Sequence, residues 1–200
     1  MKLRLAAYIA SEDWRKKYDY VGIFDDGFAR VSLNGKCGLV NKEGVEVVPL
    51  KYDAAGDFVN GLARVQLYGK GWGFVNTEGV EVVEPKYYVV DDFSNGFASV
   101  RLGDKWGFVN TEGVEIFEPK YDSVGSFRNG FAKVKLNGKY GFINTEGLEV
   151  VKLQYDGVED FHEGLAKVKR NWKWGLVNTK GEEVVPLQYD SSGEAEEHMP

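Results

Sequence analysis

Apolar and polar residues alternate along short stretches of this chain. Between residues 130 and 136, small or apolar residues alternate with lysines. A period of two is the pattern of a β-strand with one buried face. Asn137-Gly138 follows directly, and this pair favours a two-residue hairpin turn because both residues tolerate positive φ. Residues 139–143 are therefore the expected return strand of a β-hairpin.

A second turn and a third strand follow the hairpin. Asn144–Gly147 places a glycine where a turn requires a left-handed residue. Leu148–Val151 is rich in apolar and β-branched residues, and the proline or lysine that often follows this stretch in other parts of the chain is expected to end the strand. The unit is thus predicted to be a three-stranded antiparallel meander.

The same pattern recurs along the whole chain. Tyrosines separated by 34 or 35 residues stand at Tyr18, Tyr52, Tyr87, Tyr121, Tyr155 and Tyr189. Glycines repeat in the same register, and one extra residue near Gly69 to Gly71 is the only slip. Five repeats are therefore predicted within residues 18–190, at 18–51, 52–86, 87–120, 121–154 and 155–188.

These repeats predict an all-β fold, a tandem array of five three-stranded antiparallel β-meander repeats. We expect an open, twisted solenoid, because the chain stops after Tyr189-Asp190 without a strand that would complete the N-terminal half-repeat. A closed five-bladed, propeller-like ring is the alternative. Residues 1–17 are expected to be a degenerate half-repeat cap with a strand near Lys2–Ile9. Residues 191–200 have little apolar content and are expected to form a flexible tail.

Composition and charge exclude several classes of protein. Hydrophobic residues make up 43% of the chain, which is too many for a disordered one. The net charge of −6 gives no general attraction to nucleic acid or to anionic membranes. No apolar run is long enough to cross a membrane, and residues 1–14 do not fit a signal peptide, so a cytoplasmic protein is expected. The single cysteine, Cys37, cannot form an intramolecular disulfide.

One segment carries a family resemblance. Gly103 to Gly113 has the sequence Gly-Asp-Lys-Trp-Gly-Phe-Val-Asn-Thr-Glu-Gly, and the preceding Phe-x-x-Gly-[Phe/Leu]-Ala-x-Val pattern recurs in register in all five repeats. The chain resembles the bacterial WG-repeat (KWG-repeat) family over about residues 18–190. The resemblance implies an all-β repeat fold and an interaction role, and it implies no catalytic residues. Cys37 and Tyr140 replace the tryptophan of the motif in two repeats.

Aromatic residues form two rows across the repeats. Trp72, Trp106, Tyr140 and Trp174 share one strand position with Cys37. The row could be a stacking platform for sugars or bases. Packing between repeats is the favoured interpretation, because cysteine suits a buried position. The row of Phe24, Phe58, Phe93, Phe127 and Phe161 is expected to be core.

Basic residues form a stripe on the polar face of the first strand. It contains Arg30, Arg64, Arg101, Lys133, Lys135, Lys167 and Lys169. A glutamate row on the third strand (Glu46, Glu81, Glu115, Glu149 and Glu183) is expected to pair with the stripe as weak, solvated ion pairs. Lys167, Lys169, Arg170 and Lys173 cluster near Trp172, which makes a nucleic-acid or acidic-partner site the alternative.

Loop tips precede the first conserved-looking glycine of each repeat. They are Asp25-Asp26, Val59-Asn60, Ser94-Asn95, Arg128-Asn129 and His162-Glu163, and they differ while the surrounding pattern does not. Variation at one fixed place in a scaffold is typical of recognition loops, although unconstrained drift would give the same pattern. Candidate partner-binding residues are Asp25, Asp26, Asn60, Asn95, Arg128, His162, Glu163, Lys167, Lys169, Arg170, Trp172 and Lys173.

Catalytic and metal-binding motifs are absent from the sequence. There are two histidines, no Gly-rich phosphate loop, no nucleophile elbow and no zinc-ligand spacing. The carboxylates recur with the repeat, whereas a catalytic site is an asymmetric group of residues. The sequence therefore predicts a non-catalytic scaffold without cofactor or metal that binds a protein or peptide. A carbohydrate or cell-surface ligand module that uses exposed tryptophans is the alternative.

Overall fold

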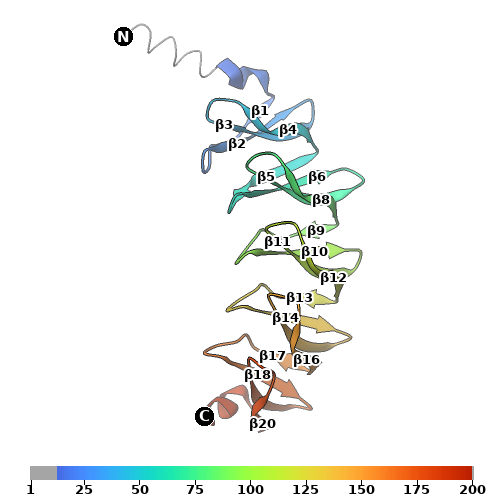
Figure 1. Ribbon diagram of the computed structural model, residues 1–200, viewed down its shortest axis with the longest axis vertical. Helices are drawn as coiled ribbons and strands as arrows, with labels where there is room; N and C mark the ends of the chain where they lie inside the picture. The colour runs from blue at the N-terminus through green and yellow to red at the C-terminus, as the bar shows by residue number, and fades with distance from the viewer. Residues whose placement is uncertain (1–12, 200) are drawn as a thin grey trace, which may run out of the picture. The chain divides into compact units, whose positions relative to one another are not determined.

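The computed structural model describes residues 13–199 and contains five four-stranded antiparallel sheets (Figure 1). The chain divides into two compact units, one made of the residues up to Phe93 with Thr111–Val114, the other of Ser94–Asn110 with the residues from Glu115 onward. The all-β expectation is confirmed. The tyrosines at which the second to fifth predicted repeats begin are each the last residue of a fourth strand: Tyr52, Tyr87, Tyr121 and Tyr155.

The first unit begins with a 3₁₀ helix, η1 (Asp13–Lys17). Its first sheet has the order β1-β2-β3-β4, formed by β1 (Tyr20–Val21), β2 (Phe28–Leu33), β3 (Lys36–Asn41) and β4 (Glu46–Tyr52). Its second sheet has the order β5-β6-β7-β8, formed by β5 (Ala54–Val59), β6 (Leu62–Leu67), β7 (Gly71–Asn76) and β8 (Glu81–Tyr87).

The third sheet is formed by β9 (Val89–Val90), β10 (Phe97–Leu102), β11 (Lys105–Asn110) and β12 (Glu115–Tyr121). The fourth contains β13 (Ser123–Val124), β14 (Phe131–Leu136), β15 (Lys139–Asn144) and β16 (Glu149–Tyr155). The fifth contains β17 (Gly157–Val158), β18 (Leu165–Arg170), β19 (Lys173–Asn178) and β20 (Glu183–Tyr189), and helix α2 (Ser192–Glu196) follows it.

The prediction of three-stranded repeats was wrong by one strand. The segment after each tyrosine, expected to be a plain crossover, adds a short strand at the sheet edge. In the fourth sheet, Ser123 pairs with Lys135 and Val124 with Val134. A strand of two residues is too short to show a period of two, so the sequence pattern could not reveal it.

The predicted hairpin turns are confirmed. Asn137 and Gly138 have φ values of 51° and 79°, and Asn34-Gly35 forms the same left-handed pair. The predicted strand end at proline was wrong, because Pro49 lies inside β4. Strand β4 is at the sheet edge, and its register with β3 shifts between Cys37 and Leu39. Proline has no backbone N–H group, but at this place its absence interrupts no regular ladder of hydrogen bonds.

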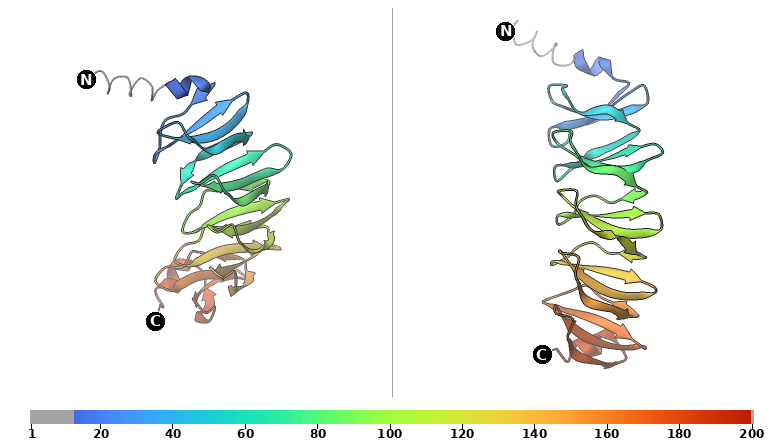
Figure 2. Two further views of the ribbon diagram at one scale, coloured as in Figure 1. Left: turned by 45° about the horizontal axis from the view of Figure 1, so that its top comes forward. Right: turned by 45° about the vertical axis from the view of Figure 1, so that its right-hand side comes forward.

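The hydrophobic core lies between successive sheets within each unit. In the second unit, Phe142, Val151 and Tyr155 of the fourth sheet pack against Ala166, Val168 and Val177 of the fifth sheet and against Phe161, which precedes that sheet's β18. Figure 2 shows these two sheets, β13–β16 and β17–β20, lying against each other. Leu39, Val48 and Tyr52 meet Phe58, Ala63, Val65 and Val75 in the same way in the first unit. Each sheet is therefore stabilised by its neighbours in sequence, as in other repeat proteins.

Segments outside the repeats cover the first and last sheets. Trp14 of η1 packs edge-on against Tyr18 and Phe24, next to the cluster of Ala29, Val31 and Val40. The predicted strand near Lys2–Ile9 lies outside the described residues.

The predicted loose tail was wrong, because α2 buries Ala195 completely. Ser191 caps its N-terminus by accepting a hydrogen bond from the N–H of Glu194. Its one buried side chain is too small to signal a packed helix in the sequence.

Candidate functional site

The loop tips are tight hairpin turns with outward side chains. The second tip residue has a left-handed φ in every repeat: Asp26, Asn60, Asn95, Asn129 and Glu163 have values between 44° and 52°. Both tip residues are exposed in each repeat, including the predicted binding residues Asp25, Arg128 and His162.

The two positions of each tip have different roles. The amide Nδ2 of Asn95 donates a 2.8 Å hydrogen bond to the carbonyl of Phe127 in the next repeat. Asn60 and Asn129 make the same bond to Phe93 and Phe161. These asparagines hold successive tips in register. Variation is concentrated in the first tip position, which carries Asp25, Val59, Ser94, Arg128 and His162.

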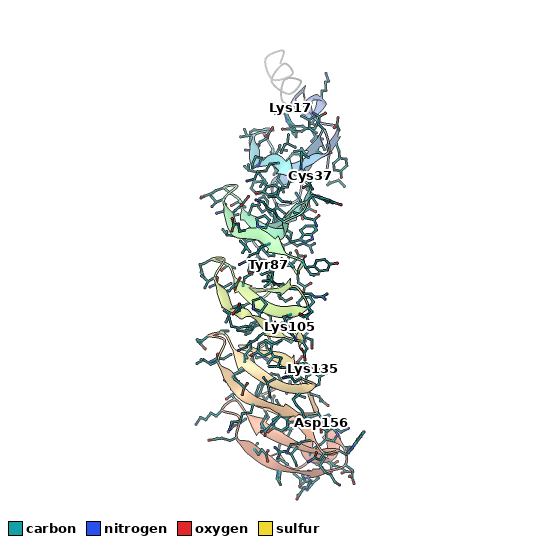
Figure 3. The ribbon with its side chains drawn as sticks, turned by 90° about the vertical axis from the view of Figure 1, so that its right-hand side faces the viewer. Lys17, Cys37, Tyr87, Lys105, Lys135 and Asp156 are labelled. Carbon is teal, nitrogen blue, oxygen red and sulfur yellow. The ribbon has the colours of Figure 1, made fainter. Side chains whose placement is uncertain are left out.

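The tryptophan row is neither an open platform nor a buried core. Trp72, Trp106, Tyr140 and Trp174 are all half-buried, as is Cys37. Each lies across from the tyrosine that begins the next repeat, as Trp174 does from Tyr189. The other face of the row carries basic side chains, and Lys135 Nζ lies 4.9 Å from the centre of the Tyr140 ring. Lys135 is labelled in Figure 3. The phenylalanine row is core from Phe58 onward, whereas Phe24 is half-buried against Trp14.

Three residues of the basic stripe pair with aspartates of the next repeat and not with the expected glutamate row. Arg30 and Arg64 each lie 2.9 Å from an aspartate of the next repeat, Asp57 and Asp92 respectively. Lys133 lies 3.4 Å from Asp160. These basic residues and the aspartates face each other because consecutive sheets stack. The sequence pattern within one repeat does not reveal such a contact between repeats.

The glutamate row instead binds the tyrosine that begins each repeat. Tyr52 Oη donates a 2.6 Å hydrogen bond to Glu81, which also pairs with Lys51. Burial of the Tyr52 ring, followed by this bond, raises the pKa of the phenol well above its ordinary value. The Lys51 hydrogen bond is the main cause of a lowered pKa at Glu81. These contacts join consecutive sheets and have a structural role.

The basic cluster near Trp172 is mostly neutralised. Lys167 lies 2.7 Å from Glu196 and 3.5 Å from Glu159. Arg170 contacts Glu183 at 3.4 Å, and Lys173 contacts Asp190 at 2.5 Å. Three of the four cations thus have carboxylate partners, so little positive charge is left for nucleic acid, and that hypothesis gains no support.

Trp172 is the most unusual residue of this cluster. Its side chain is 81% exposed, and its φ of 67° is a left-handed value that bulky residues rarely adopt. Glycine occupies the matching turn position at Gly35 and Gly138. Lys169 Nζ lies 4.8 Å from the Trp172 ring and 5.4 Å from the Trp174 ring. A cavity of about 350 Å³ lined by Asp156, Lys169 and Trp172 lies beside it.

The second unit has two further cavities at its loop tips. The larger, about 660 Å³, is lined by Ser94, Asn95, Ser126, Phe127, Arg128, Asn129 and Gly130. The smaller, about 250 Å³, lies between the last tip and α2, and its lining includes His162, Glu163, Lys167 and Glu196.

The structure separates the predicted binding residues into two groups. His162 and Glu163 precede β18, whereas Arg170 is its last residue and Trp172 and Lys173 follow it, so the length of the strand lies between the two groups. Asn95 and Arg128 are brought together around the cavity of about 660 Å³. Ser126 of that cavity was missed. Comparison of repeats could have found it, since Asp57, Asp92 and Asp160 occupy the matching positions.

Among residues 13–199, no group of three or more His, Cys, Asp or Glu residues is placed to hold a metal ion. The same part of the chain contains no helix long and apolar enough to cross a membrane.

Repeated sheets, cores between neighbours and aligned loop tips define a β-repeat protein. The family described as "WG containing repeat" matches residues 16–37, 38–70, 72–106, 106–140, 140–174 and 174–197. The chain belongs to this family, which confirms the resemblance inferred from the motif.

Comparisons with other proteins add little to the family assignment. No curated protein matches the chain. Among solved structures, the computationally designed Ika8 protein is 11% identical with a TM-score of 0.41, over 82% of this chain and 60% of its own. Kluyveromyces lactis Hsv2 is 15% identical with a TM-score of 0.41, over 80% and 60%. The chain therefore spans about 60% of the length of these structures.

Proposed function

We propose that the chain is a non-catalytic scaffold that binds a protein or peptide partner along its loop tips. The observation that carries this proposal is that the two positions of the three inner tips have different roles. Asn60, Asn95 and Asn129 fix the tips to the following repeat, while the exposed residue beside each one differs between repeats. A rigid framework with one variable side chain per repeat is the arrangement that recognition surfaces use.

Selection from a random-peptide display library tests the proposal. Binders of the wild-type chain are measured again on a variant with Asp25, Val59, Arg128 and His162 replaced by serine. We expect binding to fall while the melting temperature stays unchanged, because these exposed side chains support no buried contact. The matched control replaces exposed residues of the turns between the third and fourth strands of four sheets by serine and should bind normally. These residues are Lys42, Glu78, Glu112 and Glu146. Equal binding by both variants would contradict the proposal.

A carbohydrate ligand is a second candidate, and Trp172 favours it. An exposed indole beside a carboxylate and an ammonium group offers a stacking face with hydrogen-bonding groups at its edge. The half-buried tryptophan row offers no comparable face. On an array of immobilised polysaccharides, Trp172→Gly should abolish binding without loss of stability, because glycine suits the left-handed turn. Tyr68→Gly, at an exposed hairpin tip of the second repeat, is the control. Absence of any bound polysaccharide removes this candidate.

We also propose that the sheets form an open array rather than a closed ring. The outer face of the first sheet packs against Trp14, and α2 packs on the fifth sheet, where Ala195 is buried. A ring would require these two faces to meet. Small-angle scattering tests this point: an open array should exceed the radius of gyration of roughly 16 to 17 Å that compact chains of this length have. A value within that range would favour the ring.

A further inference from the structure

One junction between repeats lacks the ion pair that other junctions have. Within the first unit, Arg30 pairs with Asp57 and Arg64 with Asp92. Lys133 pairs with Asp160 in the second unit. The matching positions at the junction of the third and fourth repeats are Ser99 and Ser126, so both members of the pair are replaced together.

A cavity opens at this junction. It has a volume of about 660 Å³, within the range of about 300–1,000 Å³ usual for ligand pockets. Serine is much shorter than arginine, lysine or aspartate, so the paired replacement leaves space that these longer side chains take up at other junctions. The cavity is lined by one member of this pair, Ser126, at a loop position where three other repeats carry an aspartate.

The chemistry of the lining is that of a carboxylate-binding site. Ser94 and Ser126 supply hydroxyl groups, and Arg128 supplies a guanidinium that can bind a carboxylate with two N–H groups. No acidic residue is among the lining residues. The Arg128 side chain is 71% exposed, and its Nε is 3.9 Å from Asp160, whose other oxygen is nearer to Lys133. The guanidinium therefore keeps most of its donors available.

Neighbouring asparagines add acceptors to these donors. Asn95 and Asn129 use their Nδ2 groups to bind the carbonyls of Phe127 and Phe161, so their amide oxygens remain as acceptors. A guanidinium and hydroxyls beside two amide oxygens match a peptide segment, which carries backbone N–H groups next to an acidic side chain.

We propose that this cavity binds an aspartate or glutamate of the partner peptide, with the side-chain carboxylate on Arg128 and the serine hydroxyls. The proposal rests on the proposed peptide-binding function and assigns the fourth repeat a specificity for acidic residues. Recognition is confined to this junction because the other ion pairs fill the corresponding space with their own charged side chains.

Titration with a capped Gly-Glu-Gly tripeptide, followed by the backbone amide signals in NMR spectra, tests the cavity directly. A dissociation constant in the millimolar range corresponds to about −4 kcal/mol, a reasonable affinity for one carboxylate with a few hydrogen bonds. We expect shifts at Ser94, Asn95 and residues 126–130, and none with a capped Gly-Gln-Gly tripeptide. Equal shifts with both tripeptides, or none at these amides, would overturn the proposal.

Two variants locate the binding. Ser99→Arg with Ser126→Asp restores the ion pair of the other junctions, so it should keep the melting temperature and lose the glutamate-dependent shifts. Arg128→Gln changes one exposed side chain and should weaken binding by about tenfold or more, worth about 1.4 kcal/mol. Unchanged binding in Arg128→Gln would rule out the assigned role.

The display selection separates this proposal from the wider one. Peptides that need the tips but bind Arg128→Gln normally would refute the acidic pocket and leave the scaffold function intact. Glutamate-dependent shifts without any selected peptide would support the pocket and count against the scaffold function.

Discussion

The phenol of Tyr52 illustrates how single residues join the repeats. Its ring is fully buried between two sheets, while its hydroxyl reaches the half-exposed carboxylate of Glu81. Spacing alone identified this tyrosine as a regular feature, but the partner of its hydroxyl lies in the next sheet, and no local pattern indicates it.

Replacement of Tyr52 by phenylalanine should reduce the free energy of unfolding by about 1–2 kcal/mol, because a hydrogen bond to a charged group is lost while the ring still packs. Lys51 remains to compensate the charge of Glu81, which limits the loss. Urea unfolding measures the effect. Tyr68→Phe is the control, since that side chain is 91% exposed and should give no change. Equal loss in both variants would contradict the assigned role of the Tyr52 hydroxyl.

At the same scale, the candidate site was only partly predictable. The exposed tips followed from their variation, and Arg128 was among them. The replacement of the ion pair by Ser99 and Ser126 was not recognised, because serine carries no functional signal by itself. Its meaning depends on the charged residues that the other repeats place at the same two positions.

At the scale of the element, one glycine series is explained by a close approach of strands. A Cβ atom on Gly141 would collide with the carbonyl of Val151, where β16 crosses over β15. Gly38 and Gly175 stand in the same relation to Val48 and Val185. The register shift in each of these edge strands brings its backbone over the glycine.

Gly141→Ala should therefore destabilise the protein by about 1–3 kcal/mol, the usual cost of overpacking a tightly packed site. Gly125→Ala is the matched control, because its new Cβ would come no closer than 3.6 Å to another atom. Thermal unfolding of both variants checks the comparison. A Gly141→Ala protein as stable as the control would mean that β16 moves away without cost.

Strands and turns were predictable to different degrees. The hairpin of β14 and β15 was found from alternation and from Asn137-Gly138, because both signals are local. The two-residue edge strands and helix α2 were not, since the strands are too short to show a period of two and the helix buries a single alanine. The inner strands of each repeat were therefore foreseen better than its edges.

At the scale of the molecule, lysine–carboxylate contacts recur from repeat to repeat. Hydrogen bonds from Lys36, Lys105 and Lys139 lower the pKa of Asp53, Asp122 and Asp156 respectively. Backbone N–H groups of the hairpin turns bind the same carboxylates, as Asn137 does Asp122. Each contact is weak, but the carboxyl groups of all three aspartates take up protons in the same range of pH.

Stability should consequently fall in acid. A lowered pKa in the folded state means that the unfolded state binds protons first, so the stabilisation is complete above about pH 5 and is lost as the pH falls through the folded-state values. Urea midpoints measured between neutral pH and pH 3 should decrease steadily. Asp122→Asn should show a weaker dependence on pH than the wild type, and a parallel curve would contradict this origin.

Helix α2 has a consequence that reaches beyond one molecule. Glu196 pairs with Lys167 as Asp160 pairs with Lys133 one repeat earlier, so the helix stands in for a following repeat. Without it, the last sheet would offer the first sheet of another copy the kind of face that inner sheets offer their successors. Such head-to-tail association has no closing symmetry and grows into fibres. We therefore expect that loss of the helix would leave the last sheet open to self-association, so that a few residues after the repeats would favour dispersed molecules over filaments.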